Sequence, residues 1–313
     1  MPASRLRIAV PDLVSNSYFP CLAASALGFY SEQGLDVEAV HISPVEKCVA
    51  ALRDGEVDFI GASAHAPLLA FPDWEGVKLV CAQSQGLYWL LVMRADLGMA
   101  RGDLRGLAGR KIAAVPFVAA GLRRILMAAG IDPQAEDIVI ISPATAARPG
   151  VNFGVAAAQA LESGAIDGFM ANAMGAEIAM RRGVGTVLLD VRRGDGPSEC
   201  FGYTMPAIAA TDRTIATSPD AAAAIVRAIR STHAALKADP SQAGAAGERL
   251  FPPFEASLIA DIIERDLPYY STRITHGFVA TMNAYAHAVG LLSVPALPYD
   301  RVVATRFAEL WDA

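Results

Sequence analysis

One short pattern occurs twice in the chain, and this repeat constrains the fold more than any other feature. Residues 51–62 read ALRDGEVDFIGA, and residues 160–171 read ALESGAIDGFMA. In each copy the pattern predicts a helix that ends at a glycine, Gly55 or Gly164, because glycine readily adopts the left-handed conformation that closes a helix. A β-branched residue then begins a buried strand. Two copies of a helix-to-strand unit predict two similar α/β lobes, whose ligands bind beyond the carboxyl ends of the strands.

Composition and charge exclude several classes of function. The net charge of −6 and the pI near 5.4 argue against a nucleic-acid partner. No uncharged apolar run of about 18 residues occurs, so we expect no membrane insertion. The four cysteines lack metal-ligand spacing, and we expect neither a metal nor a cofactor. The first residues do not read as a signal peptide, so we expect a cytoplasmic protein, or a periplasmic one whose signal peptide has been removed.

Strands and helices alternate along most of the chain, which predicts parallel sheets. The pattern pauses after residue 94 and begins again, and a Gly-Asp-Gly-Pro breaker occupies residues 194–197. We therefore expect a first lobe of residues 1–94 and 200–313, including a helical tail after Pro219, and a second lobe of residues 95–199. The chain would pass twice between these lobes, which predicts a hinge.

Three stretches resemble a known family. They are SNSYFPCLAASALGFYSEQGLDVEAV at residues 15–40, ALRDGEVDFIGASAHAPLLAF at residues 51–71, and DLRGLAGRKIAAV at residues 103–115. They are similar to solute-binding proteins of ABC importers for sulfonates, taurine, nitrate and thiamine-pyrimidine precursors. The resemblance covers residues 8–239. It implies the two-lobed type II periplasmic-binding-protein architecture, with a mostly parallel sheet flanked by helices in each lobe.

The same resemblance implies a function. The protein would capture a small organic anion or a heteroaromatic ligand, of the sulfonate, aromatic-acid or pyrimidine type, by hinge closure. It would deliver this small-molecule ligand to an ABC permease, and we expect no catalytic residues.

Two alternatives stay open. The first is an enzyme on the same scaffold, a lyase, a desulfinase or a thiamine-pyrimidine synthase, with His65 as its acid or base. The synthase-like relatives carry a cofactor lysine where this chain has Gly61, and a cysteine-rich motif that is reduced here to Cys200-Phe201. The desulfinase relatives use a first-loop cysteine where this chain has Ser15. The second alternative is a cytoplasmic ligand sensor.

Candidate ligand-binding residues follow from the expected strand ends, where helix N-termini favour an anionic group. The repeat aligns Ser63 with Asn172 and His65 with Met174, so these two loops are expected to face each other. Turn or cap chemistry is the alternative for Asn16 and Ser17. Residues 142–145 and Arg148 are weaker candidates. The candidates are Asn16, Ser17, Tyr18, Ser63, His65, Gln83, Tyr88, Phe117, Asn172, Cys200 and Tyr203.

Overall fold

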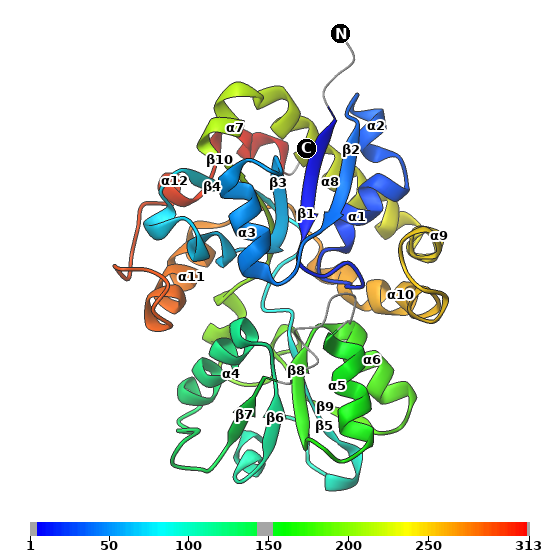
Figure 1. The fold of residues 1–313 in the computed structure, drawn as a ribbon, viewed down its shortest axis with the longest axis vertical. Coiled ribbons are helices and arrows are strands. Elements are labelled where there is room, and N and C mark those ends of the chain that lie inside the picture. The colour runs from blue at the N-terminus through cyan, green and yellow to red at the C-terminus, as the bar shows by residue number, and fades with distance from the viewer. Residues whose placement is uncertain (1–4, 143–152, 312–313) are drawn as a thin grey trace. The chain divides into compact units, whose positions relative to one another are not determined.

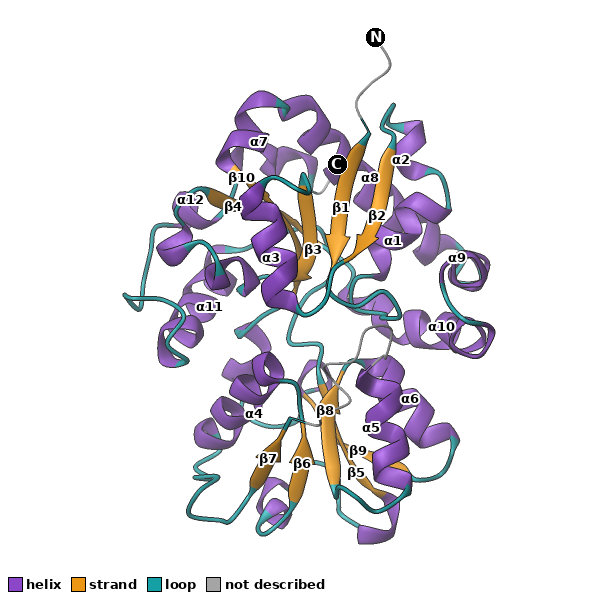
Figure 2. Ribbon diagram, viewed as in Figure 1, coloured by secondary structure: helices purple, strands orange, loops and turns teal. Residues whose placement is uncertain are grey.

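The computed structural model describes residues 5–142 and 153–311, and the chain divides into two compact units. Unit 1 comprises Met1–Gln85 and Thr204–Ala313, and unit 2 comprises Gly86–Tyr203. Each unit holds a five-stranded sheet flanked by helices (Figures 1 and 2). This architecture confirms the two-lobed fold class expected from the sequence.

The sheet of unit 1 has the strand order β2-β1-β3-β10-β4. Strands β1, β2 and β3 run parallel, and β10 runs antiparallel to both β3 and β4. Four strands therefore share one direction, and a single strand that returns from unit 2 opposes them. Their bounds are β1 Leu6–Val10, β2 Val37–His41, β3 Phe59–Ser63, β4 Val77–Ala82 and β10 Pro206–Thr211.

The sheet of unit 2 repeats this plan with the order β7-β6-β8-β5-β9. Strands β6, β7 and β8 run parallel, and β5 runs antiparallel to β8 and β9. In each sheet the fourth strand of the order, β10 in unit 1 and β5 in unit 2, is the first strand after the chain crosses from the other unit. The bounds are β5 Leu90–Arg94, β6 Lys111–Ala113, β7 Val139–Ile141, β8 Gly168–Ala171 and β9 Gly185–Asp190.

Helices cover both faces of each sheet (Figure 1). In unit 1, α3 packs on β1 and β3, while α1 packs on α8 and β2. In unit 2, α5 and α6 pack together against β5 and β9. The bounds are α1 Phe19–Ala26, α2 Phe29–Glu32, α3 Val45–Asp54, α4 Pro116–Ala128, α5 Phe153–Glu162, α6 Ala173–Arg181, α7 Asp212–Thr217, α8 Pro219–Ala238, α9 Gln242–Leu250, α10 Pro253–Asp266, α11 His276–Ala288 and α12 Tyr299–Val302.

The repeated sequence forms the same structure in both units. Helix α3 is closed by Gly55 at φ +76°, and Gly164 follows α5 at φ +71°. The aspartate of each copy then accepts a hydrogen bond from a backbone N–H of the neighbouring parallel strand. Asp58 accepts the backbone N–H of Arg7 at 2.8 Å, and Asp167 accepts that of Lys111 at 2.9 Å.

The sequence pattern also predicts a strand over residues 202–210, a helix from Ala66 and a helix over residues 299–311, and these predictions were wrong in detail. Residues 198–202 form a 3-10 helix, so the strand expected over 202–210 begins only at Pro206. The helix expected from Ala66 is a 3-10 turn, Ala66–Leu69, with proline inside it. The helix expected over 299–311 divides because Val303 bridges to Leu79 in the sheet. Helix α9 was not predicted.

The compact units divide after Gln85 and after Tyr203, whereas the sequence suggested boundaries after 94 and 199. The difference arises because β5 pairs with β8 and β9. The lobe boundaries expected from the sequence, after residues 94 and 199, stay a prediction. In the described part of the chain, no helix is both long and apolar enough to cross a bilayer.

We expect Asp58→Ala to lower the free energy of unfolding by about 1–3 kcal/mol, because the N–H of Arg7 loses its acceptor. Asp167→Ala is expected to do the same in unit 2. Urea denaturation measures both. Asp54→Ala is the control, because its ion pair with Arg53 is exposed and worth little. Asp58→Ala with wild-type stability would contradict this account of the repeat.

Candidate functional site

The loop between β1 and α1 is buried and closely organised. The N–H of Ser17 donates to Ser15 Oγ at 3.1 Å, and the N–H of Phe19 donates to the carbonyl oxygen of Asn16 at 3.3 Å. The side-chain amide of Asn16 donates through Nδ2 to Asp266 Oδ2 at 2.7 Å. The turn is thus formed by backbone groups and the Ser15 hydroxyl, and within the described residues the N-cap residue of α1 makes no side-chain capping bond.

Two polar atoms of this loop nevertheless stay unused. Asn16 is 2% exposed and Ser17 is 3% exposed. Asn16 Oδ1 and Ser17 Oγ are buried and have no hydrogen-bond partner among residues 5–142 and 153–311. A buried polar atom without a partner costs about 1–3 kcal/mol. A polar ligand that hydrogen-bonds to these two atoms would remove this cost, so the loop after β1 is a candidate ligand-binding site.

Gln83 holds the start of α1 against the sheet. Its Oε1 accepts the N–H of Cys21 at 3.1 Å, and its Nε2 donates to the carbonyl oxygen of Ala207 in β10 at 3.4 Å. Gly61 leaves room for this arrangement, since a Cβ there would lie 2.9 Å from Cys21 Sγ and 3.1 Å from Gln83 Nε2. Both ends of the Gln83 amide are engaged within the protein, and these two bonds link the start of α1 to β10.

His65 lies just beyond β3 and is 1% exposed. Its Nδ1 is 2.9 Å from Thr204 Oγ1, and its ring meets the Tyr285 ring edge-on at 5.1 Å. Burial lowers the pKa of His65 to about 3. The imidazole is therefore neutral at neutral pH and brings no positive charge to a ligand. Ser63, also buried, is the last residue of β3 and lies in register with Pro206 of β10.

In unit 2, the candidates Tyr88 and Phe117 both contact one tryptophan, Trp89. The ring of Trp89 packs edge-on against Tyr88 at 5.5 Å and against Phe117 at 6.1 Å. The guanidinium of Arg192 lies 5.9 Å from the centre of the Tyr88 ring. Tyr88 and Trp89 are buried, whereas Phe117 is half-buried near the start of α4.

The other three candidates of unit 2 have identifiable structural contacts. Asn172 caps α6, because its Oδ1 accepts the N–H of Gly175 at 3.3 Å. The hydroxyl of Tyr203 donates to Glu199 Oε1 at 3.2 Å. Cys200 is fully buried, and burial raises the pKa of its thiol to about 11. It is therefore a poor nucleophile at neutral pH.

Sequence analysis missed Asp266, Thr204 and Tyr285, each of which contacts a candidate residue. Asp266 is 250 residues from Asn16 in sequence, and no local motif links them. Among the weaker candidates Ser142 is described, whereas residues 143–145 and Arg148 lie outside the described residues. That the loops of Ser63 and Asn172 face each other stays a prediction.

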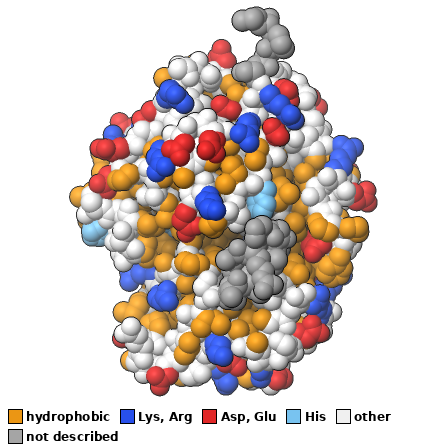
Figure 3. Space-filling view, in the orientation of Figure 1, with side chains coloured by type: hydrophobic (Ala, Val, Ile, Leu, Met, Phe, Trp, Pro, Cys, Tyr) orange, Lys and Arg blue, Asp and Glu red, His pale blue; other side chains and the backbone are white. Residues whose placement is uncertain are grey.

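Charge and metal chemistry add little to the site. On the face drawn in Figure 3, Lys and Arg side chains lie among Asp and Glu rather than in one stripe. Within residues 5–142 and 153–311, no cluster of three or more His, Cys, Asp or Glu could hold a metal ion. Burial raises the pKa of the Cys48 thiol to about 12 and those of Cys21 and Cys81 still further.

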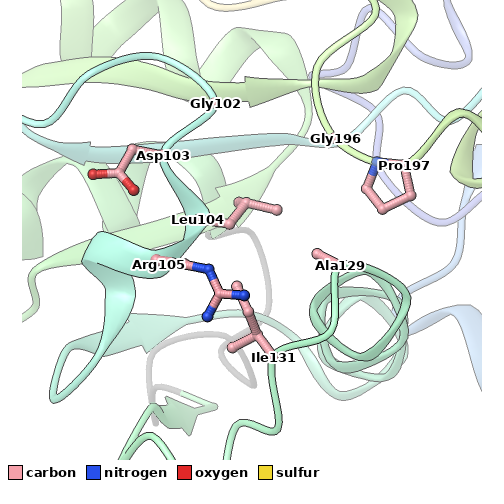
Figure 4. Close-up of a pocket in the computed structure, with 8 residues that line it drawn as sticks. All are labelled: Gly102, Asp103, Leu104, Arg105, Ala129, Ile131, Gly196 and Pro197. Carbon is pink, nitrogen blue, oxygen red and sulfur yellow. The ribbon is translucent and has the colours of Figure 1, made fainter.

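An open depression of about 400 Å³ lies on unit 2, and none of the residues that line it is a candidate residue. Leu104, Ala129, Ile131 and Pro197 line it, while Asp103 points away from Ala129 and Pro197 (Figure 4). The carboxylate of Asp103 caps its own turn by accepting the N–H of Gly106. This depression therefore lacks the buried, unused polar atoms that distinguish the first loop of unit 1.

A family model described as NMT1/THI5 like matches residues 15–243. The chain belongs to the NMT1/THI5-like family. No curated protein sequence matches it significantly. The matched span begins at the first loop and includes every candidate site residue named above.

Solved structures share the fold of this family member. A protein from Bordetella bronchiseptica RB50 is 20% identical, with a TM-score of 0.77 over 98% of this chain and 96% of that one. The alkanesulfonate-binding protein SsuA from Xanthomonas axonopodis pv. citri is 15% identical, with a TM-score of 0.70 over 96% and 99%. The periplasmic nitrate-binding protein NrtA from Synechocystis PCC 6803 is 14% identical, with a TM-score of 0.69 over 97% and 87%.

A desulfurization enzyme, DSZB, also has this fold, at 14% identity and a TM-score of 0.64 over 97% of this chain and 98% of that one. Binding proteins and an enzyme therefore share the architecture. The fold alone does not decide between binding and catalysis in the NMT1/THI5-like protein, and that decision rests on its own residues.

We expect the buried histidines to make the protein acid-sensitive. His65 has a pKa of about 3 when folded, against an ordinary histidine value of 6.5, so the unfolded chain binds a proton first as the pH falls. Its stabilising contribution is fully present above pH 6.5 and is lost progressively towards pH 3. Thermal unfolding of His65→Gln is expected to depend less on pH across this window than that of wild type.

His41→Gln, at an exposed histidine, is the control and is expected to keep the wild-type profile. His233 is also buried with a pKa near 3, so some pH dependence will remain in the single variant. An identical acid profile for wild type and His65→Gln would show that His65 is not buried as a neutral group.

Proposed function

We propose that the protein is the solute-binding component of an ABC importer. It captures a small organic molecule of the sulfonate, aromatic-acid or pyrimidine type, and its two units close on that molecule. The observation that carries this proposal is the pair of buried, unpartnered atoms in the first loop, Asn16 Oδ1 and Ser17 Oγ. Family membership and the fold shared with binding proteins for alkanesulfonate and nitrate support it.

Within this proposal the residues take different roles. Gln83 positions the start of α1, because both ends of its amide are engaged. Closure is driven by the higher affinity of the closed state for the ligand. The residues proposed to contact the ligand are Asn16, Ser17, Tyr18, Ser63, His65, Tyr88, Phe117, Asn172, Cys200 and Tyr203.

The residues at the enzyme-like positions favour binding over catalysis. A general base works best with a pKa near the working pH, and the pKa of buried His65 lies near 3. Ser15, at the place of the desulfinase cysteine, accepts the N–H of Ser17 through its hydroxyl. We propose an ABC permease as the partner and a periplasmic location, like that stated for NrtA.

We expect at least one compound from a panel of sulfonates, aromatic acids, nitrate and pyrimidines to raise the melting temperature of the purified protein. At 100 times its dissociation constant, a ligand adds about 2.7 kcal/mol of stability. Mass spectrometry is expected to recover the compound unchanged. Conversion to a product that is lost in His65→Ala would contradict the binding function and support the enzyme.

Ser17→Ala is expected to weaken binding of that compound about twofold to twelvefold, as the loss of about 0.5–1.5 kcal/mol from one neutral hydrogen bond predicts. Isothermal titration calorimetry measures this change. The matched control is Ser31→Ala, at an exposed serine of α2. Equal affinities for wild type and Ser17→Ala would contradict the proposal that the first loop contacts the ligand.

A further inference from the structure

The start of α1 has few backbone donors left for a ligand. A helix N-terminus binds an anion through N–H groups that have no partner within the helix. Here the N–H of Phe19 is bonded to the carbonyl oxygen of Asn16, and Pro20 carries no N–H. The N–H of Cys21 is bonded to Gln83 Oε1 at 3.1 Å. The first turn of this helix therefore lacks the donors with which a sulfonate or carboxylate would pair.

The Asn16 amide is fixed in one orientation by Asp266, the last residue of α10. An ionised carboxylate accepts hydrogen bonds and donates none. The amide nitrogen of Asn16 must therefore face Asp266, and Nδ2 donates to Oδ2 at 2.7 Å. This leaves Oδ1 as the buried atom without a partner. An amide oxygen only accepts, so the group that satisfies it must be a donor.

The hydroxyl of Ser17 is also compatible with a ligand group that donates a hydrogen bond. Ser17 Oγ is buried without a partner, and a hydroxyl can donate or accept, so it suits either kind of ligand group. An oxyanion at this loop would meet the lone pairs of Asn16 Oδ1 and, behind them, the carboxylate of Asp266. Both contacts are repulsive. An amino or hydroxyl group at the same place would make favourable hydrogen bonds with Asn16 Oδ1 and Ser17 Oγ.

We infer that the part of the cargo bound at the first loop is a hydrogen-bond donor, an amino group, an amide N–H or a hydroxyl, and that any anionic group of the cargo binds elsewhere. This inference rests on the proposed function and narrows it. Within the cargo classes above, it favours amino-substituted molecules over plain sulfonates and over nitrate.

Matched compounds that differ by one donor test the inference. Each pair replaces an uncharged amino group by a methyl group of similar size: sulfanilate with para-toluenesulfonate, para-aminobenzoate with para-toluate, and aminopyrimidine with methylpyrimidine. Calorimetry and thermal shift measure binding to the full-length wild-type protein. For the pair that binds, we expect the amine to bind at least about tenfold more tightly, because its methyl analogue leaves Asn16 Oδ1 unpaired.

Asp266→Asn tests the cause of this preference. An amide at residue 266 can donate as well as accept, so the Asn16 side chain is free to turn and present Nδ2 to the ligand. We expect the amine-to-methyl affinity ratio to fall at least about threefold. Glu264→Gln, an exposed acid-to-amide change on the same helix, is the matched control and is expected to keep the wild-type ratio.

The outcomes separate this inference from the proposed function. A methyl analogue or nitrate that binds the wild type as tightly as the amine overturns the inference and leaves the proposed function standing. An unchanged ratio in a folded Asp266→Asn variant overturns the part played by Asp266. Binding of no compound in either panel contradicts the proposed function, and the inference falls with it.

Discussion

Two aspartates fix the central strands of the two sheets, and the rest of each unit is built from that register. The N–H of Asp58 donates to the carbonyl oxygen of Arg7, and its carboxylate accepts the N–H of the same residue. Asp167 makes the same pair of bonds with Lys111. Because the N–H and the carbonyl oxygen of Arg7 and of Lys111 are engaged in this way, these bonds stabilise the register of β3 on β1 and of β8 on β6. Parallel strands in fixed register bring their carboxyl ends, and the loops that follow them, to one edge.

The chemistry of the first loop follows from what packs around that edge. Gly61 has no side chain, so Cys21 and Gln83 can pack closely against β3. Gln83 then accepts the N–H of Cys21, which the first turn of α1 would otherwise offer to a ligand. Asp266, at the end of α10, accepts a hydrogen bond from the amide nitrogen of Asn16. The protein thus engages the N–H groups of Ser17, Phe19 and Cys21, and it leaves an amide oxygen and a hydroxyl without a partner. Buried and neutral, His65 adds polarity without charge, which suits recognition better than proton transfer.

The sequence predicted features that depend on local physics. Gly55 and Gly164 end their helices because glycine tolerates positive φ, and the resulting repeat was enough to predict two α/β units. The loop after β1 followed from the alternation of strands and helices, whereas its burial did not. The contact between Asn16 and Asp266 was not predictable, since it joins residues 250 apart that share no motif. For the same reason, the anion preference inferred from helix N-termini missed the bond that Gln83 makes to Cys21.

A crystal structure of the protein with the amino compound that binds most tightly tests the central claim most directly. The account predicts an N–H or O–H group of that compound within about 3 Å of Asn16 Oδ1, with Ser17 Oγ as a second contact. Asn16 Nδ2 is expected to keep its bond to Asp266. A sulfonate or carboxylate oxygen in contact with Asn16, or a compound bound away from the first loop, would contradict it.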